Sequence, residues 1–153
     1  MDNKIIRCIL APLTDGYILL PNTAVAELLS FTMPEPLKKA PRWVLGELVW
    51  NGWQVPVISY EFLIDDNDRN TVTSKTRILI VKTLGESTQV NYIGLVIQGL
   101  PRLKKVSAAT LVEKQVDELS DTVFSEVTID DLHAVIPELG ELTRTVELAA
   151  YDS

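Results

Sequence analysis

The sequence is poor in the residues that most catalytic and metal centres require. It contains one histidine, His133, and one cysteine, Cys8, among 153 residues. A zinc site takes about four ligands, mostly cysteine and histidine, and a single cysteine cannot form an internal disulfide. The seven glycines are dispersed and form no phosphate-binding loop. We therefore predict that the protein is not an enzyme and binds no metal or cofactor.

Basic residues and long apolar runs are also scarce. The chain has 14 Lys and Arg against 21 Asp and Glu, which gives a net charge of −7. Nucleic-acid-binding surfaces are basic, so this charge argues against a nucleic-acid partner. No apolar run approaches the roughly 20 residues needed to span a bilayer, and the acidic start at Met1-Asp2-Asn3 is unlike a signal peptide. We predict a cytoplasmic protein without membrane insertion.

The most informative segment is residues 44–58, which reads as one tight β-hairpin. Its Asn51-Gly52 pair suits a type I′ turn, because both central residues of that turn need positive φ. A two-residue turn there pairs Trp50 with Trp53, Leu48 with Val55, and Gly46 with Val57. Side chains alternate along a strand, so these six share one largely apolar face. We expect both tryptophans to pack into a core.

The chain repeats this plan 79 residues later. Residues 123–137 place Asp130-Asp131 at the turn and His133 at the position of Gln54, where we expect an exposed strand residue. Tyr17-Ile18-Leu19-Leu20 and Tyr92-Ile93-Gly94-Leu95 are related in the same way at a spacing of 75. The repeat predicts two similar β units. Short strands and compact turns favour an all-β fold of small barrels.

The other expected elements are short. We predict strands at Lys4–Leu10, Gly16–Leu20, Arg77–Lys82, Val90–Gln98 and Leu103–Val106. We predict short helices from Asn22 through Leu28 and from Leu111 to Val116, and a C-terminal helix at 138–150. Residues 64–75 read as an exposed connector and Gly85–Thr88 as a turn.

Several of these segments resemble the CheW-like domain. The matching residues are Leu20-Pro21, Val25-Ala26-Glu27-Leu28, Val44-Leu45-Gly46 and Val55-Pro56-Val57-Ile58. The resemblance is good over 16–64 and fainter over 78–142. It implies one domain over 1–153, built from two five-stranded SH3-like β-barrels that share a hydrophobic core. The approximate subdomains are then 16–82 and 83–142, the latter with the N-terminal strand.

The resemblance also implies a function. CheW-like proteins are adaptors that couple a methyl-accepting chemoreceptor to the regulatory domain of a CheA-type histidine kinase. Carried over by position, Val25 and Glu27 match the family's "V.E" residues and Gly46 its glycine at the start of the hairpin, so these are candidate receptor contacts. Val49 is expected to add an apolar contact. Asn51 stands where the family has an arginine that supports coupling.

The wording "LLPNTAVAEL", "WVLGELVWNG" and "VPVISYE" is similar to one branch of the family, the ChpC-type adaptors of chemosensory systems that control type IV pili and twitching motility. Two alternatives stay open. Because Asn51 replaces the arginine, the protein could be an accessory adaptor that binds only one of kinase and receptor. It could also be a small-ligand-binding β-barrel protein that uses the cleft between the units, although the sequence shows no converging polar groups. Exposed barrel edges would allow a weak homodimer.

Overall fold

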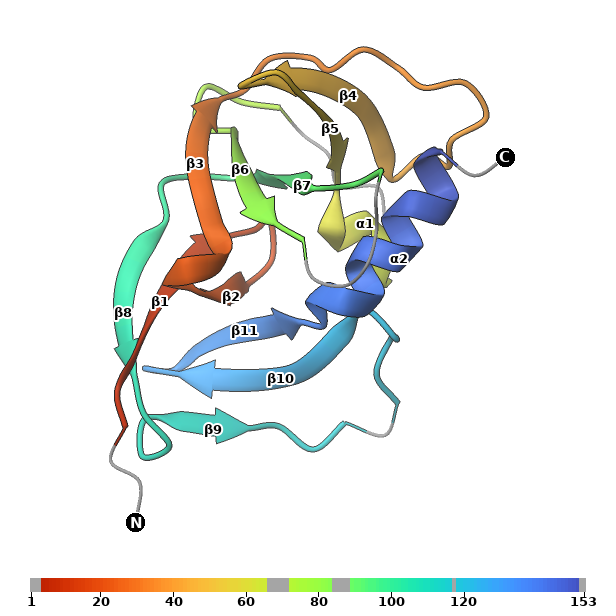
Figure 1. The fold of residues 1–153 in the computed structure, drawn as a ribbon. Coiled ribbons are helices and arrows are strands. Elements are labelled where there is room, and N and C mark those ends of the chain that lie inside the picture. The colour runs from red at the N-terminus through yellow and green to blue at the C-terminus, as the bar shows by residue number, and fades with distance from the viewer. Residues whose placement is uncertain (1–3, 66–71, 84–88, 117, 152–153) are drawn as a thin grey trace.

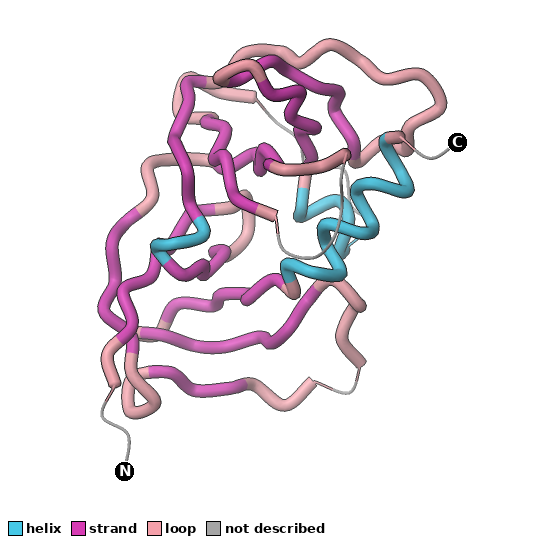
Figure 2. Tube along the Cα trace, viewed as in Figure 1, coloured by secondary structure: helices cyan, strands magenta, loops and turns pink. Residues whose placement is uncertain are grey.

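A computed structural model describes residues 4–65, 72–83, 89–116 and 118–151 (Figure 1). The strands are β1 (Ile6–Pro12), β2 (Tyr17–Pro21), β3 (Val25–Ser30), β4 (Val44–Trp50), β5 (Trp53–Ile58), β6 (Arg77–Lys82), β7 (Tyr92–Ile97), β8 (Arg102–Val106), β9 (Leu111–Glu113), β10 (Val123–Ile129) and β11 (Leu132–Pro137). The helices are a 3-10 turn, η1 (Asn22–Ala24), and two α-helices, α1 (Tyr60–Asp65) and α2 (Leu139–Ala150). Both α-helices lie on the same side of the molecule (Figure 2). The fold is all-β with short helices, as predicted.

The strands form two sheets with the same internal plan. One sheet has the order β3-β6-β7-β5-β4, and the other has the order β8-β1-β2-β11-β10-β9. Apart from β9, the two orders correspond strand for strand, and each contains one parallel pair, β5 with β7 and β11 with β2. We call the six-stranded sheet the first unit and the five-stranded sheet the second unit. The predicted repeat is confirmed, with β9 added at one edge.

The sheets do not divide at the expected boundary between residues 82 and 83. β2 joins the first unit through its parallel pairing with β11, and β7 joins the second unit through β5 and β6. The chain therefore begins the first unit, builds the whole second unit, and returns to complete the first. Local patterns locate strands, but the choice of sheet depends on pairing between distant segments.

Both predicted hairpins form in the predicted register. In the first, Trp50 pairs with Trp53, Leu48 with Val55 and Gly46 with Val57. In the second, Ile129 pairs with Leu132, Val127 with Ala134 and Ser125 with Ile136. All four turn residues have positive φ: 49° at Asn51, 81° at Gly52, 49° at Asp130 and 63° at Asp131. Positive φ at both central positions is the requirement of the type I′ turn.

Two predicted short helices are wrong. Helical structure after Asn22 ends at Ala24, and Val25–Ser30 forms strand β3 instead, paired along β6. The segment after Ser107 forms strand β9, which pairs with β10. In both cases a neighbouring apolar strand supplies backbone partners that a helix of one or two turns cannot match. The predicted connector 64–75 and turn 85–88 fall largely or wholly outside the described residues.

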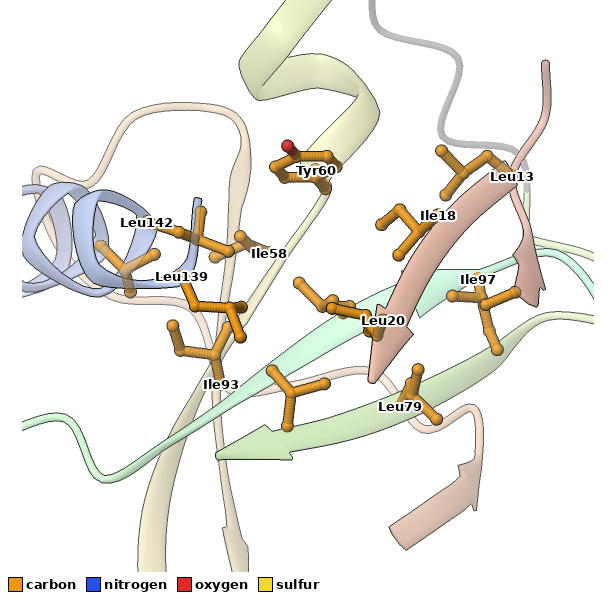
Figure 3. Packing of buried hydrophobic residues seen from close by; sticks show 14 of the residues in the cluster. Leu13, Ile18, Leu20, Ile58, Tyr60, Leu79, Ile93, Ile97, Leu139 and Leu142 are labelled. Carbon is orange, nitrogen blue, oxygen red and sulfur yellow. The ribbon is translucent and has the colours of Figure 1, made fainter. Parts of the chain in front are cut away.

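Three apolar clusters hold the units together. One lies within the first unit around Leu10 and Ile129, and one within the second around Val57 and Ile80. The largest lies between the units, and Figure 3 shows ten of its side chains labelled. The labelled residues are Leu13, Ile18, Leu20, Ile58, Tyr60, Leu79, Ile93, Ile97, Leu139 and Leu142. Because both sheets and α2 contribute to it, this shared core joins the two units.

The C-terminal helix α2 forms as predicted. The carboxylate of Glu138 accepts a hydrogen bond of 3.2 Å from the Gly140 N–H, which caps the helix N-terminus. Leu139, Leu142 and Val146 are buried in the shared core at helical spacing. The far end is tied to the second unit by Tyr151, described below.

Candidate protein-binding surfaces

Val25 and Glu27 lie on β3, an edge strand of the second unit. Val25 is half-buried and packs against the shared core, whereas Glu27 is exposed. Between them the pairing with β6 shifts by one residue, so Val25 pairs with Val81 and Glu27 with Ile80. This β-bulge bends the strand. Val25 and Glu27, which we call the β3 surface, therefore combine an apolar contact at the seam between the units with a solvent-facing carboxylate.

Gly46 is buried in β4. Its φ is 145°, and a Cβ there would overlap the backbone oxygen of Glu35. That close approach serves two backbone hydrogen bonds between Glu35 and Glu47, of 2.9 and 2.8 Å, which cover the outer edge of β4. The structure thus gives Gly46 a role in packing, and its expected receptor contact stays a prediction.

Val49 and Asn51 lie at the free end of the β4–β5 hairpin, and we call them the hairpin surface. Val49 is 74% exposed, on the opposite face from the paired tryptophans, and it pairs with Gln54. Asn51 is exposed at the turn. An exposed valine of this size is a suitable small apolar contact, because exposed β-branched side chains lose little entropy on binding.

The structure does not gather the five candidate residues at one place. β3 and β4 are the two edge strands of the second unit and do not pair with each other, so the β3 surface and the hairpin surface belong to different strands.

The tryptophans differ from the expectation in part. Trp50 is half-buried, but Trp53 is 43% exposed rather than in a core. Both stack edge-on against Tyr92, with ring centroids 4.9 and 5.6 Å away. Alternation placed the tryptophans on the correct face. It could not show that this face opens to solvent at the hairpin end.

His133 is exposed on β11, as predicted from the repeat. Its Nδ1 lies 3.0 Å from the Lys114 Nζ, so the imidazole accepts this hydrogen bond in its neutral form. Lys114 is the hydrogen-bond partner of His133 among the described residues. These residues also hold no cluster of three or more His, Cys, Asp or Glu placed to bind a metal ion.

A hollow of about 650 Å³ lies between α1, the β1–β2 turn and β11. Glu61, His133 and Lys114 line it with several apolar side chains. The Glu61 carboxylate accepts hydrogen bonds from the backbone N–H groups of Thr14 and Asp15, at 2.9 and 3.2 Å, and so closes the β1–β2 turn. Converging polar groups, which the sequence did not reveal, are therefore present here.

The geometry defines a two-barrel, all-β domain whose exposed candidate residues lie on β3 and at the β4–β5 hairpin. The chain belongs to the CheW-like domain family, whose model matches residues 7–147. The fold is similar to the crystal structure of the scaffolding protein TtCheW from Thermoanaerobacter tengcongensis, with a TM-score of 0.75 and 18% identity over 92% of this chain and 89% of that one. No curated protein matches the sequence. Among the described residues, no helix is long and apolar enough to cross a membrane.

Proposed function

We propose that the protein is a non-catalytic cytoplasmic adaptor that couples a methyl-accepting chemoreceptor to the regulatory domain of a CheA-type histidine kinase. Membership of the CheW-like family carries this proposal. The two separate candidate surfaces, on β3 and at the β4–β5 hairpin, support it, because coupling requires simultaneous contact with two partners. Individually weak contacts suffice where many copies act together.

The first test is a tagged pull-down of the full chain from its native bacterium, with the retained proteins identified by mass spectrometry. Recovery of both a chemosensory kinase and a receptor is the expected result. Recovery of neither by folded bait would contradict the adaptor function. Retention of pilus-system proteins would support the proposed role in type IV pili and twitching motility, and a kinase of another system would contradict it.

Bait variants separate the two surfaces. Val49→Glu alters an exposed side chain, so it should weaken one partner's recovery without unfolding the protein. Val112→Glu, at a 63% exposed residue of the first unit, is the matched control. Glu27→Lys tests the β3 surface better than Val25→Glu, because Val25 also packs against the shared core. Unchanged recovery with both Val49→Glu and Glu27→Lys would rule out these surfaces.

Because Asn51 stands in place of the family's arginine, a narrower proposal is that the protein binds only one of kinase and receptor. Asn51→Arg restores the family's residue at an exposed turn position. Under this proposal the variant recovers the partner that the wild-type protein lacks. If the set of retained proteins does not change, Asn51 does not limit partner choice.

The alternative function, small-ligand binding, rests on the hollow beside α1. A ligand that binds only the folded state raises the melting temperature, and the rise grows with the logarithm of ligand concentration above the Kd. A metabolite screen by thermal shift would support this alternative if a compound raises the melting temperature of the wild-type protein but not of a Glu61→Gln variant.

A further inference from the structure

The edge strands of the two sheets are not equally accessible for pairing. Within the described residues, β4 is covered by its hydrogen bonds with Glu35, β3 is interrupted by a bulge, and β9 has only three residues. Bulges, covering segments and short length are common ways to protect a sheet edge. β8 has none of these three, and its five residues pair with β1 without any register shift. Among the edge strands of the described residues, β8 therefore has the longest regular outer edge. Its edge carries lysine and arginine, which discourage pairing with another basic strand but not with an acidic one.

β8 is also the most basic segment of this acidic protein. It carries Arg102, Lys104 and Lys105, and its partner β1 adds Arg7. Figure 1 shows β8 running beside β1 along one margin of the molecule. Four of the 14 basic residues therefore lie on two neighbouring strands of a chain whose net charge is −7.

The cationic side chains on the two faces of β8 differ in their interaction partners. On one face, the Lys104 Nζ lies 2.7 Å from a carboxylate oxygen of Asp130, and the Arg102 guanidinium lies 5.7 Å from the centre of the Tyr17 ring. On the other face, Arg7 and Lys105 are direct cross-strand partners. Both are exposed, and neither has an ion pair among the described residues.

Like charges placed directly opposite each other on a sheet are destabilising. The Arg7–Lys105 pair therefore costs stability in the isolated protein, and a carboxylate brought close to Lys105 would relieve that cost. The neighbouring pair on the same face is Ile9 with Leu103, and Leu103 is 59% exposed. This face thus presents an apolar position next to a doubly basic one.

We propose that the free edge of β8 accepts an acidic extended segment of a partner protein as an added strand. Backbone hydrogen bonds along the edge supply affinity, and alternating side chains supply specificity. An acidic side chain of the segment lies opposite Lys105, and an apolar one two residues along covers Leu103. Arg7, one strand further in, adds to the positive charge on this face. A second copy of β8 is a poor occupant, because it would bring two sets of cations together. This contact is separate from the β3 and hairpin surfaces, so its failure would leave the proposed adaptor function standing.

The test uses the full-length ¹⁵N-labelled protein and a blocked peptide in which glutamate and valine alternate at every second position, with threonine between them. One face of such a strand carries both the acidic and the apolar side chains. Titration at low salt is expected to shift the amide resonances of residues 102–106 and to slow their hydrogen exchange. The same peptide with lysine in place of glutamate is expected to cause neither change. A glutamate–valine peptide with alternate backbone nitrogens methylated is expected to bind at least tenfold more weakly, because it lacks strand donors.

Two double variants with equal changes in net charge locate the site. Arg7→Glu with Lys105→Glu is expected to weaken binding of the acidic peptide at least tenfold. Lys38→Glu with Lys75→Glu, at exposed residues outside β1 and β8, is expected to keep binding within twofold. Circular dichroism checks that both variants fold. The proposal is overturned if the acidic peptide leaves the amides of 102–106 unchanged, if both variants bind it equally, or if the methylated peptide binds as well as its parent.

Discussion

The hydroxyl of Tyr60 donates a hydrogen bond of 2.9 Å to the backbone oxygen of Thr122, which joins the start of α1 to the segment before β10. Both residues are buried. The same oxygen also accepts a 2.8 Å hydrogen bond from the Glu138 N–H. One carbonyl thus connects the second unit, the first unit and the cap of α2.

Tyr60→Phe should cost about 1 kcal/mol, the net value of one buried hydrogen bond. The cost stays small because the Glu138 N–H still satisfies the Thr122 oxygen. Urea unfolding of wild-type and variant protein measures this cost. Tyr92→Phe is the control, because the Tyr92 hydroxyl makes no hydrogen bond to the described residues. A loss above about 3 kcal/mol would mean that the phenylalanine ring also disturbs packing.

Stability should fall as the pH rises above about 10, the ordinary pKa of tyrosine. Burial raises the pKa of Tyr60, and burial with the 2.8 Å hydrogen bond to the Glu47 carboxylate raises the pKa of Tyr151. Above that pH the unfolded chain loses these protons while the folded protein keeps them, so unfolding becomes more favourable. Urea midpoints between pH 8 and 11 should decline less in Tyr60→Phe/Tyr151→Phe. Equal decline would show that other groups are responsible.

Gly46→Ala should destabilise the protein by about 2 kcal/mol or more, because it combines a strained φ with a backbone overlap. The added Cβ meets the Glu35 oxygen and would displace the segment that covers β4. Gly52→Ala is the matched control: its φ is 81°, but nothing lies within 4 Å of the added Cβ. If the two alanine variants have the same stability, the segment around Glu35 moves away from the added Cβ without lowering the free energy of unfolding.

Leu142→Ala should cost about 2–5 kcal/mol, the usual range for a leucine truncated in a packed core. Leu142 is fully buried between α2 and the two sheets. Leu148→Ala on the same helix removes the same atoms from a side chain that is 51% exposed, so it should change stability much less. Similar losses in both variants would indicate that α2 contributes through helix formation rather than through the shared core.

The hairpins were predictable from sequence because their information is local. Asn51-Gly52 specifies a two-residue turn, and a fixed turn fixes the register of every pair behind it. The repeat then extended the same reasoning to Asp130-Asp131, whose turn is less obvious alone.

The segment that carries the β3 surface was predicted as a helix but forms a strand. Val25, Leu28 and Leu29 have spacing that suits a helix, and Asn22 suits a cap, yet the segment pairs with β6. The secondary structure of a short amphipathic segment depends on the strand available to pair with it, and here the paired residues lie from 47 (Ser30 with Arg77) to 56 (Val25 with Val81) positions away. The basic edge of β8 was equally hidden, because its alignment with Arg7 depends on the pairing of two distant strands.

The interrupted path of the first unit has a consequence for synthesis on the ribosome. The second unit, β3–β7, is one continuous stretch of chain and can pair all its strands once residue 97 has emerged. The β1–β2 hairpin, made earlier, lacks its neighbours β8 and β11 until much later. The apolar residues of this hairpin therefore stay uncovered during most of translation. They are the part of the nascent chain that depends most on protection from aggregation before release.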